Sequence, residues 1–174
     1  MKEDSQDDTR HLCPSSRPEL AECVLFGVAG GSVEAPRVIY LRQAHAVTDE
    51  LLSLAGPATP PEVFRMAAPC AQHRCKHFDG SKCGLAQRIV ELVPPVVESL
   101  PRCPIRPRCL WWHQEGADAC QRCPQIVTLN DSASAEVRMA SDPDHATHTS
   151  IGVPGDQPGT RVPRRDNAAR TTCR

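Results

Sequence analysis

Apolar residues in the first third of the chain form two short runs and then a helical period. The runs CVLFGVAG (23–30) and PRVIYL (36–41) are rich in β-branched residues and are separated by GSVEA. This pattern predicts a β-hairpin. The stretch DELLSLAG follows Thr48 and stops at Gly56-Pro57, which predicts a short helix with threonine as its N-cap.

Two further helices and a strand are predicted around the cysteines. Thr59-Pro60-Pro61-Glu62 has the form of a capping box with proline in the first turn, so EVFRMAA (62–68) is predicted to be helical. The apolar residues of LAQRIVELV (85–93) lie on one helical face, and Pro94-Pro95 must end that helix. QIVTL (125–129) has the composition of a strand.

The two ends of the chain differ in character from its middle. Residues 1–19 form an acidic stretch that we expect to be a flexible leader. Residues 130–174 are rich in proline, glycine, serine, threonine and charge, which is typical of a disordered tail. Residues 20–129 are therefore predicted to be the domain, a small loop-rich α+β fold stabilised by metal.

Composition indicates why metal is expected. Only 3% of the 174 residues are aromatic, whereas the chain has 17 prolines and 10 cysteines. A small domain with few large core side chains usually adds disulfides or metal. The sequence has no apolar secretory segment and no run of about 18 apolar residues for a membrane span, so we expect a cytoplasmic protein. Thiols stay reduced there, and clustered cysteines indicate ligands.

Seven cysteines fall within residues 70–123, separated by gaps of irregular length. They are Cys70, Cys75, Cys83, Cys103, Cys109, Cys120 and Cys123. Structural zinc sites commonly use two C-x2-4-C pairs; only Cys120-x2-Cys123 clearly has that form, and Cys70-x4-Cys75 is at its edge. Iron–sulfur clusters accept wider spacing and often have proline after a ligand, as in Cys103-Pro104 and Cys123-Pro124.

The spacing thus favours one or two iron–sulfur clusters, of the 4Fe-4S type, with zinc as the alternative. Cys23 would bring the number of cysteines to eight, as two fully cysteine-ligated clusters require. Cys13 and Cys173 lie in the leader and the tail and are interpreted as incidental thiols. For zinc, His73 or His77 could complete a Cys3His site with Cys70, Cys75 and Cys83.

Two tryptophans and several arginines accompany the downstream cysteines. Trp111 and Trp112 lie between Cys109 and Cys120, and we expect one of them to shield the metal from water. Alternatively they could stack on a nucleic-acid base while Arg106 and Arg108 contact phosphate. Residues 65–123 carry nine Lys/Arg and five Asp/Glu, but the net charge of the whole chain is −1. Nucleic-acid binding is therefore only weakly supported.

No motif for nucleotide binding, zinc-dependent hydrolysis or a serine nucleophile is present, so enzymatic activity is not indicated. The favoured function is electron transfer or redox sensing with a protein partner and without a membrane. The alternative is a zinc-stapled module that binds protein or nucleic acid.

The segment PRCPIRPRCLWWHQEGADACQRCPQIVT (101–128), together with FGVAGG and FRMAAPC, resembles small cysteine-rich bacterial proteins of unassigned function. The resemblance covers residues 13–128. The resemblance implies a bacterial protein but does not indicate an activity.

Overall fold

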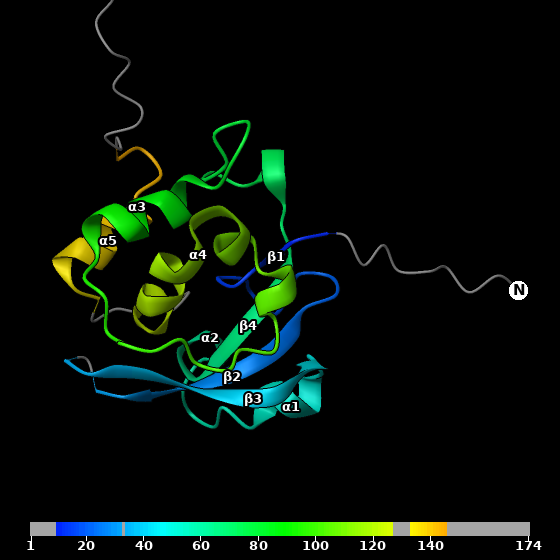
Figure 1. The fold of residues 1–174 in the computed structure, drawn as a ribbon. Helices are drawn as coiled ribbons and strands as arrows, with labels where there is room; N and C mark the ends of the chain where they lie inside the picture. Colours follow the sequence, from blue (N-terminus) through cyan, green and yellow to red (C-terminus); the bar gives the residue numbers. More distant parts are fainter. Residues whose placement is uncertain (1–9, 33, 127–132, 146–174) are drawn as a thin grey trace, which may run out of the picture.

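The computed structural model describes residues 10–32, 34–126 and 133–145. Within this part of the chain, an antiparallel four-stranded sheet and five α-helices make an α+β fold (Figure 1). The strand order is β1-β4-β2-β3. The strands are β1 (Leu12–Cys13), β2 (Val24–Gly31), β3 (Pro36–Ala46) and β4 (Phe64–Pro69).

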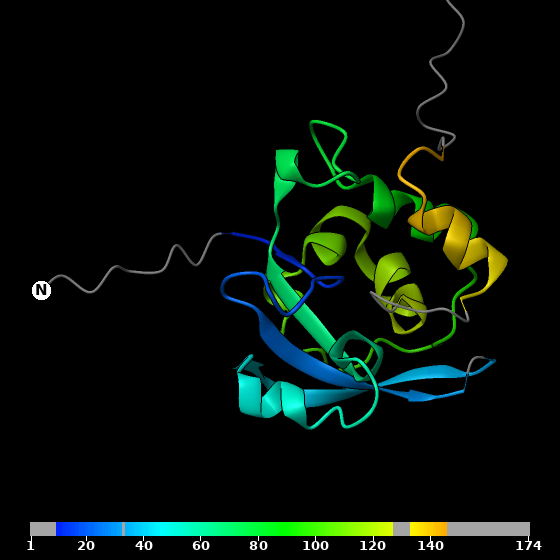
Figure 2. The same ribbon diagram turned by 180° about the vertical axis from the view of Figure 1, so that it is seen from behind.

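The larger helices gather on one face of the sheet. Figures 1 and 2 show α4 between the sheet and α3, with α5 beside α3. The opposite face packs against the residues of α1 and forms a second, smaller core. The helices are α1 (Asp49–Ser53), α2 (Pro60–Val63), α3 (Gly84–Leu92), α4 (Leu110–Arg122) and α5 (Ala135–Ser141).

Several local predictions are confirmed. Strands β2 and β3 form the predicted hairpin, which turns after Gly31, where φ is +79° and a Cβ atom would collide with the Ala35 carbonyl oxygen. Thr48 caps α1 by accepting a hydrogen bond of 3.2 Å from the Leu51 N–H. Helix α3 ends at its C-cap Val93, immediately before the two prolines.

The helix predicted over residues 62–68 is wrong beyond its first turn. The capping box at Thr59 is present, but α2 ends at Val63 and the chain continues as β4. Phe64, Met66 and Ala68 lie in the smaller core, whereas Ala67 lies in the main core on the helical face. A strand buried on both faces is a continuous apolar run, which periodicity cannot distinguish from a buried helix.

Three other expectations change. The leader is ordered by residue 12, because β1 pairs with β4. Helix α4 occupies a stretch that was expected to be loop, and α5 lies in the segment expected to be a disordered tail, where it buries Val137 and Ala140 against α3. Gln125 belongs to a 3₁₀ turn over Cys123–Gln125, while residues 127–129 of the predicted strand lie outside the described residues.

Candidate metal centre

The nine cysteines of the described residues are all free thiols. Electrostatic interactions between thiols, and the lining of one shared cavity, divide eight of them into two candidate groups of four. Burial raises the pKa values of five of these thiols, and neighbouring thiols of the same group raise them as well; the five are Cys13, Cys83, Cys103, Cys109 and Cys120. The first centre comprises Cys13, Cys70, Cys75 and Cys83. The second centre comprises Cys103, Cys109, Cys120 and Cys123.

The first centre depends on the pairing of β1 with β4. Cys13 lies opposite Ala68 in the register, and the Cys70 N–H donates a 2.9 Å hydrogen bond to the His11 carbonyl. This brings Cys13, expected to be incidental, to the cysteines that follow β4. Burial, together with the neighbouring Cys83 and Cys70 thiols, raises the pKa of the Cys13 thiol to about 12.

Cys83 joins the first centre to α4. It is the N-cap of α3, and its backbone forms two hydrogen bonds with the side chain of Gln114. The Cys83 N–H donates to Oε1 over 2.8 Å, and Gln114 Nε2 donates to the Cys83 carbonyl over 2.9 Å. The amide therefore fixes the start of α3 against the helix that carries the second centre.

The second centre depends on a bend in α4. Cys109 is the N-cap of this helix, whereas Cys120 lies in its last turn and Cys123 is its C-cap. In a straight helix Cys109 and Cys120 would be about 16 Å apart, at 1.5 Å per residue. Gly116 interrupts the helix with φ +61° and ψ −138°, and both cysteines line one cavity. The bend is what allows them to meet.

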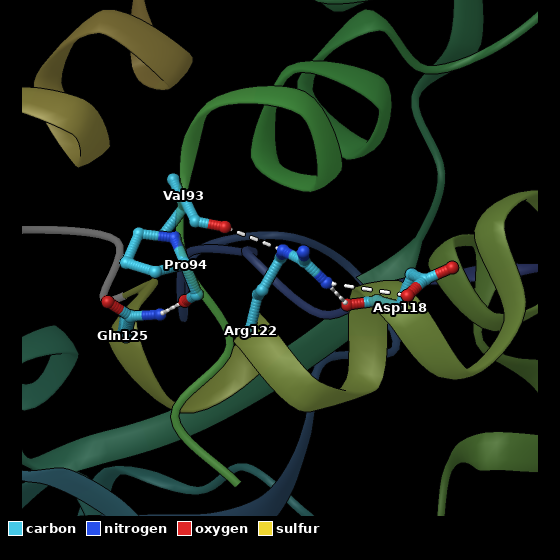
Figure 3. Close-up of polar contacts among 5 residues, drawn as sticks. All are labelled: Val93, Pro94, Asp118, Arg122 and Gln125. Carbon is cyan, nitrogen blue, oxygen red and sulfur yellow. Dashed lines mark hydrogen bonds and ion pairs between the residues drawn. The ribbon is translucent and has the colours of Figure 1, made fainter. Parts of the chain in front are cut away.

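The C-terminal end of α4 is anchored to the linker that follows α3, as Figure 3 shows. Arg122 Nε donates a 2.6 Å hydrogen bond to the Val93 carbonyl, and Gln125 Nε2 donates one of 2.6 Å to the Pro94 carbonyl. Arg122 also forms an ion pair with Asp118 at 3.6 Å. These contacts hold the segment that contains Cys120 and Cys123 in position.

The four cysteines of the second centre line a small cavity of about 20 Å³ that is partly open to solvent. Its other walls are mainly apolar and include Phe26, Tyr40 and Trp111. Two N–H groups of the lining residues, Trp111 Nε1 and Arg106 Nε, are buried without a hydrogen-bond partner among the described residues. Leaving a buried donor unpaired costs about 1–3 kcal/mol. The cavity thus offers donors to an acceptor within it.

Arg65 is a residue of the second centre that sequence reasoning missed. Only 2% of this residue is exposed, and its guanidinium contacts Cys123 and lies over the Phe26 ring at 5.8 Å. No described carboxylate pairs with it. A single arginine within the apolar run FRMAA was the available signal. Burial raises the pKa of Tyr40, and the Cys123 thiol raises it further.

Backbone N–H groups point at most of the sulfurs. The Gln72 N–H donates to Cys70 Sγ over 3.4 Å. Backbone N–H groups also donate to four other thiols and partly offset the rise in pKa that burial causes there. These thiols are Cys13, Cys83, Cys103 and Cys109. Such donors stabilise the thiolate form that binds metal.

The two centres adjoin each other through β1. Cys13 belongs to the first centre, and the next residue, Pro14, lines the cavity of the second. Leu12 also forms a parallel β-bridge with Cys109. The same short segment therefore contacts both centres.

The remaining candidate residues lie outside the two centres or contact other side chains. Cys23 packs in the smaller core on the opposite face of the sheet and joins neither centre. His73 contacts the Phe78 ring edge-on at 4.8 Å, and His77 Nδ1 lies 2.8 Å from Arg88 Nη2. Arg106 covers the Trp112 ring at 5.2 Å.

A single-ion site is not preformed in the described part of the chain, where no three His, Cys, Asp or Glu side chains form a group that could hold one metal ion.

No family model, curated protein or solved structure matches this chain, so no family is assigned. None of the helices in the described residues is long and apolar enough to cross a membrane.

Proposed function

We propose that this chain is an electron-transfer protein in which each centre holds one iron–sulfur cluster of the 4Fe-4S type. The observation that carries the proposal is the buried guanidinium of Arg65 against Cys123. A buried charge without a counter-charge is costly. Because no described carboxylate pairs with Arg65, an anionic cluster with four thiolates is the counter-charge that suits this position.

The unpaired donors of the second centre support the same assignment. Trp111 Nε1 and Arg106 Nε both belong to residues that line the cavity with the cysteines. The sulfur atoms of a bound cluster accept hydrogen bonds, and such bonds tune its reduction potential. A cluster would therefore satisfy two donors that are otherwise buried without a partner.

The irregular spacing of the cysteines along the chain favours a cluster over zinc. Iron and sulfide atoms lie between the ligands of a cluster, so its cysteines are farther apart than those of one tetrahedral ion. Each centre offers four thiols, which would occupy every ligand position of a 4Fe-4S cluster. Without an open position for substrate, electron transfer is favoured over catalysis. Free thiols and a cluster both suit a reducing compartment such as the cytoplasm.

Anaerobic purification with iron and sulfide analysis tests this proposal. We expect a brown protein with broad absorption near 400 nm and about eight irons and eight sulfides per chain, because each 4Fe-4S cluster holds four of each. Dithionite should reduce the clusters to paramagnetic species visible by electron paramagnetic resonance. A colourless protein that carries stoichiometric zinc would contradict the proposal and support a zinc-stapled module.

A further inference from the structure

The surface beside the second centre is an arginine-rich depression. It has a volume of about 960 Å³, and its lining contains three arginines, from β3 and from the loop that leads to Cys109. Arg42 and Arg102 are exposed, and Arg106 lies on Trp112. None of the described residues that line the depression is Asp or Glu.

The positive charge of this depression is uncompensated within the described chain. None of its three arginines forms an ion pair with a described carboxylate. The depression beside the first centre differs, because its Arg10 pairs with Glu22 at 2.7 Å. The second centre therefore has the more strongly cationic surface.

Cys103 connects this surface to the interior. It is half-buried and lines both the depression and the cavity of the second centre, as Arg106 does. A partner seated in the depression would contact a ligand residue of the second centre. An electron could then cross between the two proteins without a conformational change.

We propose that the Arg42–Arg102–Arg106 face docks the acidic face of a redox partner protein that exchanges one electron with the second centre. The exposed arginines come from two separate segments of a broad depression, which suits an extended acidic surface. This inference rests on the proposed electron-transfer function. One electron moves between the cluster and the partner's redox group, and no bond forms or breaks.

Binding of fluorescein-labelled poly-aspartate, followed by fluorescence anisotropy at low ionic strength, tests the surface directly. We expect Arg42→Glu combined with Arg102→Glu to weaken binding about tenfold or more, because like charges repel. Two exposed arginines away from the depression serve as the control pair, Arg37→Glu with Arg138→Glu, which makes the same change in net charge. Arg37 lies about 16 Å from Arg42 along β3 and does not line the depression.

Electron transfer provides the second readout. Ferricyanide should oxidise the dithionite-reduced protein, accepting one electron to become ferrocyanide, and stopped-flow absorption gives the rate. The Arg42/Arg102 double variant should react about tenfold more slowly at low salt, and the control pair should change much less. Poly-aspartate should slow the reaction of the parent protein.

Three outcomes would overturn the docking surface: no binding of poly-aspartate to the parent, an equal loss in the control pair, or displacement of the peptide by inorganic phosphate at matched ionic strength. The last result would indicate a site for a small anion. Iron and sulfide analysis of the same samples separates these outcomes from failure of the proposed function, because a protein that retains its clusters can still fail every docking test.

Discussion

Arg65 and Cys123 are 58 positions apart in the sequence, but their side chains and backbone are in contact at the second centre. Arg65 Nη1 donates a 2.9 Å hydrogen bond to the Cys123 carbonyl, and Nη2 lies 3.5 Å from the Cys123 sulfur. β4 places the arginine on the helical face of the sheet, and the end of α4 places the cysteine above it. The contact ties the sheet to the proposed cluster.

Replacing Arg65 with methionine should lower the reduction potential of the second centre. The variant removes a buried positive charge that favours the more negative, reduced cluster. We expect a fall of about 40 mV or more, since 1 kcal/mol corresponds to about 40 mV for one electron. A redox titration monitored by electron paramagnetic resonance measures it. Arg65→Lys, which keeps the charge, should show a smaller fall, and an unchanged potential in Arg65→Met would contradict this role.

Gly116→Ala should prevent formation of the second centre. The residue has φ +61° and ψ −138°, a conformation essentially restricted to glycine, and the bend brings Cys109 and Cys120 together. We expect iron content to fall by about half, because only the first cluster would remain.

Gly56→Ala is the matched control for this substitution. Gly56 also has a positive φ, of +65°, and a Cβ atom would meet open space at both glycines. The control also places an alanine at a positive φ in open space but should retain its full iron content. Equal iron loss in the two variants would show that general destabilisation, and not the bend, explains the result.

Cys13→Ser should lower iron and sulfide content by about half, because one of two clusters loses a ligand. Cys23→Ser should retain both clusters, since Cys23 packs in the other core. Iron and sulfide analysis of anaerobically purified variants distinguishes the two. Should Cys23→Ser lose iron while Cys13→Ser keeps it, the assignment of the first centre would be reversed.

Trp111→Phe should shift the reduction potential of the second centre downward by tens of millivolts. Trp111 is 1% exposed, and its Nε1–H has no partner among the described residues. Phenylalanine keeps most of the ring but removes this donor, and loss of a hydrogen bond worth about 1 kcal/mol corresponds to about 40 mV. Trp112→Phe, a neighbour outside the cavity lining, serves as the control. If the parent protein, Trp111→Phe and Trp112→Phe had identical reduction potentials, a hydrogen bond from Trp111 Nε1 to the cluster would be excluded.

Local signals in the sequence were sufficient to predict the elements that depend on residues a few positions apart. The hairpin of β2 and β3, the Thr48 cap of α1, the capping box at Thr59 and the end of α3 before Pro94 all follow from residues a few positions apart. The concentration of cysteines in residues 70–123 is also a local signal, and the metal centre that it indicates stays a prediction.

The grouping of the cysteines was decided by tertiary structure. Pairing of β1 with β4 brings Cys13 to Cys70. The segment predicted to be a helix is the strand β4, which is buried on both faces and contains Arg65. The bend at Gly116 joins the two ends of α4. Spacing along the chain indicated how many thiols to expect but not which of them would meet. Long-range pairing and burial depend on contacts between segments far apart in the sequence, which local periodicity does not encode.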